Sequence, residues 1–325
     1  MNEVTTRSSL DSVRVYLEDM EAERTAVASS TPGTLVAFSI FLERLLRRAK
    51  LKTSTIRILT SEPYLSEFRR AFTHTSYDPE NNYDYDEFFG DVTVNEYVGY
   101  KIYDDFPDIR NAAWLTRMKH TMVSGNVLSK LAIQQGFHHY LLASQEVRRW
   151  ETSSDPEQRE KFVKIVADML EAFCGCLVRL IQALGNNRGV GIEVVHRILK
   201  SIFGSYKVST VYEDLFDPIS RLKETYEMKR QDIDWPSGEK TNPRDSRPNA
   251  YEVIPIPEVK GWLIKVRGWP GGNGDRRVVP SNEVILSEVR VRDTSKIEAK
   301  KIAAEQALKV LRQRYNIFKE PPPKR

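Results

Sequence analysis

The sequence predicts an all-α domain followed by a smaller α+β domain. At 325 residues the chain has room for about two domains. Between residues 62 and 183, apolar residues recur with helical spacing, and Pro and Gly residues fit the boundaries of successive helices. After Asp217, β-branched and aromatic segments lie between two helical ones in the order α-β-β-β-α. We therefore expect a helical front half and a back half that contains a sheet.

The helical domain is expected over residues 34–210. Residues 1–33 are polar and end in Ser-Ser-Thr-Pro-Gly, so we expect an N-terminal extension there. Helices are expected at 35–49, 161–183 and 191–207, where apolar positions repeat every three to four residues. The helix at 161–183 is the most apolar of them, and its buried stripe is expected to contain Val163, Val166, Leu170, Phe173 and Leu177.

The α+β domain is expected over residues 217–316. Its first helix begins at Pro218, with Asp217 as the cap, and continues to residue 231. Ser295 caps the last helix, and residues 317–325 form a basic, Pro-rich tail. The three strands are expected at residues 251–256, 262–267 and 284–291.

Charge is unevenly distributed along the chain. The net charge is +4, but residues 217–325 contain 23 Lys and Arg against 16 Asp and Glu. The preceding residues therefore carry a small negative excess. A basic back half indicates that the second domain meets a polyanion.

Composition also excludes several classes of protein. No apolar run is long enough to span a bilayer, and no basic segment followed by an apolar one marks a secretory signal. The two cysteines, Cys174 and Cys176, are two residues apart on an expected helix and cannot pair with each other. We therefore expect an intracellular, cytoplasmic protein in a reducing compartment, without a membrane partner.

The segment from Asp84 to Asp91 is the most informative stretch of the chain. On a helix, Asp84, Glu87 and Asp91 stand at i, i+3 and i+7, which places three carboxylates on one face. Such a face is either solvated or holds a divalent cation, because hard cations such as Mg²⁺ take oxygen ligands.

A second acidic pair interrupts the apolar helix at 161–183. Asp168 and Glu171 stand at i, i+3, and two carboxylates in so apolar a helix are costly unless they are paired or bound to metal. The structural alternative is a salt bridge to Arg117 or Arg179. If the two acidic helices face each other, they build a Mg²⁺ site.

These motifs resemble the endonuclease domain of the ribonuclease III family. The carriers of the resemblance are Glu87-Phe88-Phe89-Gly90-Asp91 and, later, Lys164-x-x-Ala167-Asp168-x-x-Glu171-Ala172. Thr73-His74-Thr75-Ser76-Tyr77 and Gly136-Phe137 with Tyr140-Leu141 extend it across roughly residues 50–185.

The resemblance implies a Mg²⁺-dependent endoribonuclease that cuts double-stranded RNA as a homodimer. Products would carry 5′-phosphates and short 3′ overhangs, and Mn²⁺ would substitute for Mg²⁺. The implied metal ligands are Glu87, Asp91, Asp168 and Glu171.

Three neighbouring residues receive weaker roles. Lys164, one turn before Asp168, would contact a phosphate, orient Asp168 or make a structural pair. Asp84 is expected beside the site, touching RNA or a metal-held water. His74 is interpreted as structural, because metal-water chemistry needs no imidazole there.

The order α-β-β-β-α, with Ser295–Ala304 opening the last helix, resembles a double-stranded RNA-binding domain. The resemblance implies that Lys296, Lys300 and Lys301 lie across phosphates of the duplex. An ordinary solvated Lys/Glu face is the alternative. Glu224 matches a position that reaches ribose 2′-hydroxyls, although it could equally pair with Lys223 or Arg221.

Some positions depart from these patterns. Asp86 stands where the family usually has Leu, Tyr85 where it has a basic or polar residue, and Ile297 where a second Lys is usual. Two further hypotheses share the fold, a non-catalytic RNA-binding scaffold and a protein that sequesters duplex RNA to suppress silencing. Retention of all four carboxylates favours the enzyme.

Overall fold

The computed structural model describes residues 34–185, 187–204, 206–228, 233–234, 251–270 and 284–318. They belong to two compact units, one within residues 1–103, 122–152 and 161–207 and the other within 104–121, 153–160 and 208–325. The expected extension at 1–33, residues 271–283 and the end of the expected tail at 319–325 lie outside the described residues. The predicted domain boundaries, 34–210 and 217–316, remain predictions.

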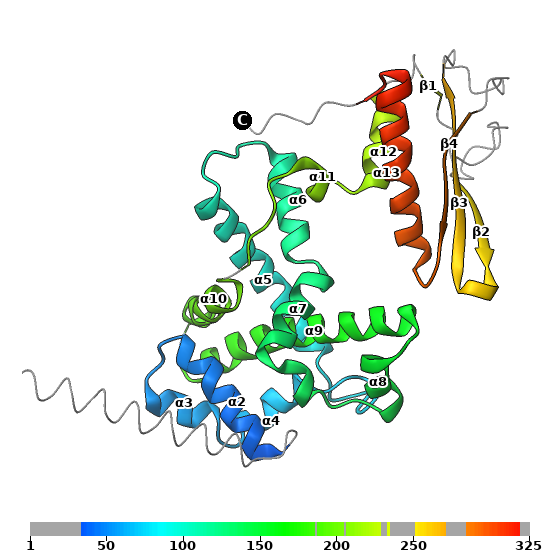
Figure 1. Cartoon of the computed structure of the whole chain (residues 1–325). Coiled ribbons are helices and arrows are strands. Elements are labelled where there is room, and N and C mark those ends of the chain that lie inside the picture. The colour runs from blue at the N-terminus through cyan, green and yellow to red at the C-terminus, as the bar shows by residue number, and fades with distance from the viewer. Residues whose placement is uncertain are drawn as a thin grey trace, which may run out of the picture. The chain divides into compact units, whose positions relative to one another are not determined.

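The first unit is built of helices (Figure 1). Two of them, α5 and α9, continue into residues of the second unit, which also holds most of α6 (Ala112–Met122) and all of α11 (Tyr212–Leu215). The helices of the first unit are α2 (Leu35–Arg48), α3 (Thr53–Leu59), α4 (Tyr64–Arg70), α5 (Asp84–Asp105), α7 (Gly125–Gln135), η1 (Phe137–Tyr140), α8 (Gln145–Arg149), η2 (Trp150–Thr152), α9 (Pro156–Ala183) and α10 (Arg188–Phe203).

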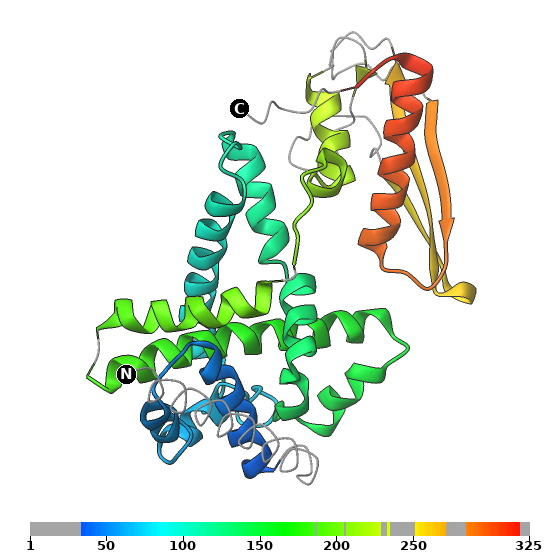
Figure 2. The ribbon, with the colours of Figure 1, turned by 60° about the vertical axis from the view of Figure 1, so that its left-hand side comes forward.

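Helix α9 lies at the centre of the first unit (Figure 2). It begins at Pro156, where the Asp155 carboxylate accepts a hydrogen bond from the backbone N–H of Glu157 at 3.0 Å. Nearly every residue from Ile165 to Leu177 is buried, including Cys174 and Cys176. The ring of Phe173 packs 5.8 Å from Phe68 of α4 and 5.6 Å from Phe137 of η1. Apolar contacts on several sides thus fix α9 in place.

Two glycines allow α5 and α9 to cross with their backbones in contact. A Cβ on Gly90 of α5 would lie 1.7 Å from the carbonyl oxygen of Glu171. A Cβ on Gly175 of α9 would lie 2.0 Å from the carbonyl oxygen of Asp86. No side chain fits at either place, so glycine is required for this close approach.

The second unit contains an antiparallel sheet beneath two helices. Strand β3 (Gly261–Pro270) is central, with β2 (Tyr251–Ile256) on one edge and β4 (Val284–Val291) on the other. The two-residue strand β1 (Ile233–Asp234) pairs with the end of β3. The 3-10 turn η3 (Pro257–Val259) joins β2 to β3. A Cβ on Gly261, where β3 begins, would lie 2.1 Å from the carbonyl oxygen of Val291.

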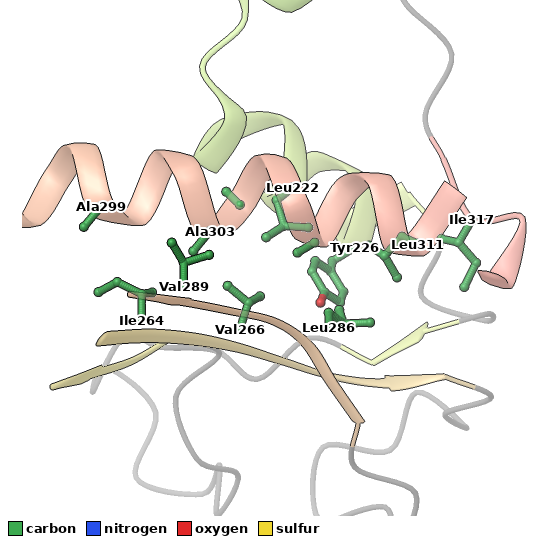
Figure 3. Packing of buried hydrophobic residues seen from close by; sticks show 12 residues of the cluster. Leu222, Tyr226, Ile264, Val266, Leu286, Val289, Ala299, Ala303, Leu311 and Ile317 are labelled. Atoms are coloured by element: carbon green, nitrogen blue, oxygen red, sulfur yellow. The ribbon is translucent and has the colours of Figure 1, made fainter. Parts of the chain in front are cut away.

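Helices α12 (Pro218–Met228) and α13 (Lys296–Tyr315) supply the other side of this core (Figure 3). Four alanines of α13 are fully buried, and their small side chains let the helix lie close to the sheet. The buried Ser287 hydroxyl of β4 donates to the carbonyl of Ala303 at 2.8 Å, which satisfies a polar group inside the interface. The apolar members of the core are Leu222, Tyr226, Ile264, Val266, Leu286, Val289, Ala299, Ala303, Ala304, Ala307, Leu311 and Ile317.

The expected fold class is confirmed, an all-α domain followed by α-β-β-β-α. The boundaries shift by a few residues. The helix expected at 191–207 spans Arg188–Phe203, because Asn187 caps it earlier with its side chain on the N–H of Val190. The strand expected at 262–267 continues to Pro270, where it pairs with β1, a strand that the sequence did not reveal.

Candidate metal centre

Three carboxylates converge where α5 crosses α9. Glu87 of α5 and Asp168 and Glu171 of α9 each offer an oxygen, and these three atoms lie within 4.8 Å of one another. Asp168 and Glu171 are buried, and Glu87 is half-buried. The structure therefore brings together three of the four predicted ligands.

The three carboxylates repel one another in a place where solvent screens them poorly. Burial is the main cause that raises the pKa of Glu171 to about 8, and the charges of Asp91, Asp168 and Glu87 add to the rise. Burial also raises the pKa of Asp168 and of Glu87. Ionising all three carboxyl groups together is therefore unfavourable without a compensating positive charge.

Lys164 supplies part of the compensation. Its ammonium donates to Asp168 Oδ2 at 2.7 Å, one helical turn away on the same helix. The Lys164 side chain is 74% exposed, so solvent weakens the attraction. This geometry fits both the orienting role and the structural pair predicted for Lys164, and it leaves the ammonium accessible.

Tyr83 is a contact that the sequence reasoning missed. The residue is buried just before α5, near enough to Asp168 for that carboxylate to affect the pKa of its hydroxyl. Burial and the nearby carboxylates raise the Tyr83 pKa, so the hydroxyl stays protonated and is able to donate. Its only sequence signal is an aromatic residue directly before an acidic helix.

Asp91 and Asp84 lie at the edge of the cluster. Asp91 is exposed one turn beyond Glu87 and accepts a 2.7 Å hydrogen bond from Asn95 Nδ2. It is outside the compact trio, although its charge reaches Glu171. Asp84 is exposed at the first residue of α5, and its charge reaches Asp168.

The Asp86 side chain belongs to a separate buried network. Arg179 of α9 donates from Nε to Asp86 Oδ1 at 3.0 Å and from Nη2 to Oδ2 at 3.2 Å. Arg70 of α4 donates to Asp86 Oδ2 at 2.9 Å, and Arg179 also reaches Glu67 Oε2 at 2.8 Å. The carboxylate that stands in place of an apolar residue is thus held by two guanidinium groups. The salt bridge considered between Arg179 and the α9 carboxylates is replaced by this one.

His74 lies close enough to the cluster for the charges of Asp84 and Asp168 to affect its pKa. Its Nδ1 accepts a hydrogen bond from the backbone N–H of Ser76 at 3.0 Å, so in the neutral ring the proton is on Nε2. Burial lowers its pKa, and the charges of Asp84 and Asp168 oppose this shift. The Ser76 backbone thus holds the ring in a turn, and the structural role of His74 stays a prediction.

The donor set fits a hard divalent cation. All three converging groups are carboxylates, which are the ligands that Mg²⁺ prefers. Burial and the neighbouring carboxylates raise the pKa of Glu171, and a bound cation would offset the repulsion among these carboxylates. Glu87, Asp168 and Glu171 are therefore the residues that would hold the metal.

The predicted RNA-contacting lysines lie on the first turns of α13. Lys296 Nζ lies 6.0 Å from the ring centre of Trp262, and Lys300 Nζ lies 5.3 Å from that of Tyr251. Lys301 Nζ is 3.6 Å from a carboxylate oxygen of Glu298. Aromatic rings on the sheet thus restrain two of the three ammonium groups.

Glu224 lies half-buried on α12 in the same unit. Of the two partners considered for it, Arg221 forms an ion pair with Glu305, and Lys223 Nζ lies 4.0 Å from a carboxylate oxygen of Glu227.

No helix in the described part of the chain is long and apolar enough to cross a membrane.

Known proteins resemble this chain in both sequence and structure. A family model described as the ribonuclease III domain matches residues 85–179, which include the whole acidic cluster. A putative ribonuclease 3 from Invertebrate iridescent virus 6 is 27% identical over 284 residues, covering 82% of this chain and 85% of the relative. A ribonuclease 3 from Pseudomonas entomophila is 36% identical over 155 residues, covering 47% and 60%. For a putative ribonuclease 3 from Frog virus 3, the match is 26% identical and covers 50% of this chain and 42% of that protein.

Among solved structures, the nuclease domain of ribonuclease III from Campylobacter jejuni aligns with a TM-score of 0.37 at 18% identity. That match covers 52% of this chain and 98% of the other. The match of residues 85–179 to the ribonuclease III domain, together with the ribonuclease 3 relatives, indicates an endoribonuclease.

Proposed function

We propose that this chain is a Mg²⁺-dependent endonuclease of double-stranded RNA that leaves 5′-phosphates and short 3′ overhangs. The match to the ribonuclease III domain and the ribonuclease 3 relatives themselves indicate an endoribonuclease. The observation that supports the finer assignment is the trio Glu87, Asp168 and Glu171, whose oxygens lie within 4.8 Å on two helices with touching backbones.

The proposed chemistry is hydrolysis of a phosphodiester. When bound, the divalent cation would supply an activated water and neutralise charge at the scissile phosphate. Glu87, Asp168 and Glu171 hold the cation, and Asp91 joins them directly or through a water. Mn²⁺ takes the same oxygen ligands, so we expect it to substitute.

The neighbouring groups position these ligands and the RNA. Lys164 fixes the carboxylate of Asp168 by a hydrogen bond, and the buried Tyr83 lies beside that carboxylate. The exposed ammonium of Lys164 remains able to meet a phosphate, and the exposed Asp84 at the start of α5 would touch RNA or a metal-held water. These roles concern where the side chains lie. Substitution of Glu171 is the most direct test of metal binding.

The second unit is proposed to hold the duplex. Lys296, Lys300 and Lys301 contact phosphates, and Glu224 contacts a ribose 2′-hydroxyl. The deep major groove of A-form RNA hides its bases, so this recognition follows shape and backbone more than sequence.

The decisive experiment is incubation of the full chain with a long duplex RNA in Mg²⁺, Mn²⁺ or EDTA, followed by analysis of the product ends. We expect cleavage with either metal, none in EDTA, and 5′-phosphates on the products. Glu171→Gln should abolish cleavage while duplex binding persists. Glu160→Gln changes an exposed carboxylate on the same helix and should cut like wild type. Cleavage in EDTA, or full activity of Glu171→Gln, would contradict the proposal.

A homodimer is proposed through the exposed apolar face of α5. Tyr85, Phe88, Phe89 and Val92 are all exposed there, and large apolar groups in such number commonly mark an interface. A cavity of about 190 Å³ lies beside them, lined by residues of α5, α9 and α10. A second copy presents the same apolar groups. A two-fold axis therefore lets this face pack against itself and bury the apolar side chains of both chains.

Light scattering coupled to size-exclusion chromatography tests the dimer. Phe88→Glu should shift the mass to that of a monomer. Tyr103→Glu is the matched control, since Tyr103 is also 65% exposed on α5 but lies four turns further along. Dimers that persist in Phe88→Glu would place the interface elsewhere.

The non-catalytic alternative is tested with the same variants. A scaffold or a silencing suppressor would act by binding duplex RNA, so Glu171→Gln would keep the biological effect. A processing enzyme would lose it. Convergence of the three carboxylates favours the enzyme, because a binding protein has no use for so costly a cluster.

A further inference from the structure

A cavity separate from the acidic cluster lies between α2 and the turn that joins α7 to η1. Its volume is about 400 Å³. Small-molecule sites occupy about 300–1,000 Å³, so the space suits a ligand larger than an inorganic ion. None of its lining residues belongs to the carboxylate cluster.

Two guanidinium groups face this cavity from one side of α2. Arg44 and Arg48 stand at i, i+4, so their side chains lie next to each other. Arg44 Nη2 donates to the carbonyl oxygen of Gln135 at 2.8 Å, and Arg48 Nη1 donates to Gln135 Oε1 at 2.7 Å. These bonds fix both groups and use a small part of the five N–H donors on each.

Among the described residues, those that line the cavity are basic or uncharged. No Asp or Glu is among the lining residues, and His139 adds a further nitrogen donor. Burial and the neighbouring charge of Arg44 lower the pKa of Arg48, as expected for two like charges brought together. A smaller adjoining hollow shares His139 and adds Arg69 and Arg148 to its rim.

Beside the arginines, His139 and two glutamines, the lining is apolar and aromatic. Ile40 and Phe41 of α2 and Ile133 of α7 form this part, and Tyr140 stacks on Phe41 with ring centres 4.6 Å apart. The Tyr140 hydroxyl already donates to the carbonyl of Ala37 at 3.2 Å. Planar apolar surface next to paired guanidinium groups suits a flat ring that carries a phosphate.

We propose that this cavity binds a nucleoside monophosphate, with the phosphate between Arg44 and Arg48 and the base against Ile40, Ile133 and the ring of Tyr140. Arg recognises phosphate through paired N–H donors, which a single ammonium does not offer. The ligand is either a free nucleotide or the 5′-phosphorylated terminal nucleotide of an RNA strand. Both present the same chemistry, and binding at this cavity does not depend on cleavage at the acidic cluster.

Calorimetric titration of the full chain in EDTA, with adenosine 5′-monophosphate as the probe, tests the proposal. We expect binding that is at least tenfold weaker for inorganic phosphate and for adenosine, since each offers half of the contacts. Arg48→Gln should weaken the affinity for the nucleotide at least tenfold. The affinity of Arg48→Lys should lie between those of wild type and Arg48→Gln. Arg47→Gln is the matched control on the same helix outside the lining, and it should stay within twofold of wild type.

A second variant keeps every charge and blocks the space. Ile133→Trp adds bulk at a partly exposed position of the lining, so it should weaken the nucleotide without removing an arginine. Thermal unfolding of each variant shows whether it is folded. Absence of nucleotide binding by wild type, or binding unchanged in both Arg48→Gln and Ile133→Trp, would overturn the assignment.

Competition identifies the source of the nucleotide. A short duplex with 5′-phosphates that displaces the probe, where its 5′-hydroxyl counterpart does not, supports an RNA end as the ligand. Displacement by neither duplex, with nucleotide binding still sensitive to Arg48→Gln, supports a free nucleotide. Equal displacement by both duplexes would contradict recognition of the terminal phosphate.

Discussion

Arg179 donates hydrogen bonds to both carboxylate oxygens of Asp86, with Nε 3.0 Å from Oδ1 and Nη2 3.2 Å from Oδ2. The pair joins α9 to α5 one helical turn from the contact between Gly175 and the Asp86 carbonyl. It therefore sets the crossing that presents Glu87 to Asp168 and Glu171. Asp86 is 1% exposed, so its charge depends on this pairing.

Replacing Asp86 should destabilise the fold strongly. Asp86→Ala leaves two guanidinium groups without their buried partner, and we expect a loss of about 3 kcal/mol in the free energy of unfolding. This is the low end for a buried pair, because the side chains of Arg70 and Arg179 remain 30% and 33% exposed. Urea unfolding measures the change. Glu43→Gln breaks the exposed pair with Arg47 and should cost below about 1 kcal/mol, and equal losses in both variants would contradict the buried role.

A methyl group at the helix crossing should separate the carboxylates. Gly90→Ala would place a carbon 1.7 Å from the Glu171 carbonyl oxygen, so α5 and α9 must move apart. We expect loss of Mn²⁺ binding by electron paramagnetic resonance and a lower Tm. Gly99→Ala is the control on the same helix, where nothing lies within 4 Å of the added carbon. It should be neutral or stabilise by up to about 1 kcal/mol, because Ala is the better helix former.

The metal-free protein should lose stability as the pH rises. The Glu171 pKa is raised from 4.5 to about 8 in the folded state, so folding favours the protonated form. Its contribution is fully present below pH 4.5 and is lost as the pH approaches 8. Unfolding in EDTA across this range measures the effect, which Glu171→Gln should reduce and Glu160→Gln should leave. Mg²⁺ should restore stability at the alkaline end in wild type by binding the folded state alone. A Glu171→Gln profile parallel to wild type would contradict the assigned pKa.

Removal of positive charge from α13 should weaken binding to all RNA duplexes equally. Lys300→Ala with Lys301→Ala should flatten the dependence of log affinity on log salt by about one to two units, since each phosphate contact releases about one counterion. Affinities for two unrelated duplexes across a salt series test this. Lys309→Ala, an exposed lysine further along α13, should keep the wild-type slope. A variant that loses one duplex and keeps the other would indicate sequence readout instead.

The order of elements and the acidic faces were accessible from the sequence because both depend on local periodicity. Spacing at i, i+3 predicts that Asp168 and Glu171 share a face whatever surrounds them. The distance between α5 and α9 was not accessible, because it depends on Gly90 and Gly175 meeting backbone from the other helix. A glycine in a helix gives no indication of what lies opposite it.

The partners of single charged residues were harder to predict. Asp86 stood out as a charge in an apolar position, yet its partner Arg179 was considered for the α9 carboxylates instead. Many arginines lie within one or two turns of an acid, and only the packed backbone decides between them. Tyr83 escaped notice for a related reason, since one aromatic residue outside any repeat has no pattern to read.

The two cysteines of α9 give this helix a built-in reporter. Both sulfurs are fully buried, and burial raises the pKa of Cys174 and Cys176 well above the usual value, so neither forms the reactive thiolate in the native state. An alkylating reagent reaches them only when α9 separates from its neighbours. The rate of alkylation therefore measures how often the helix that carries Asp168 and Glu171 opens, and ligands that close the crossing should slow it.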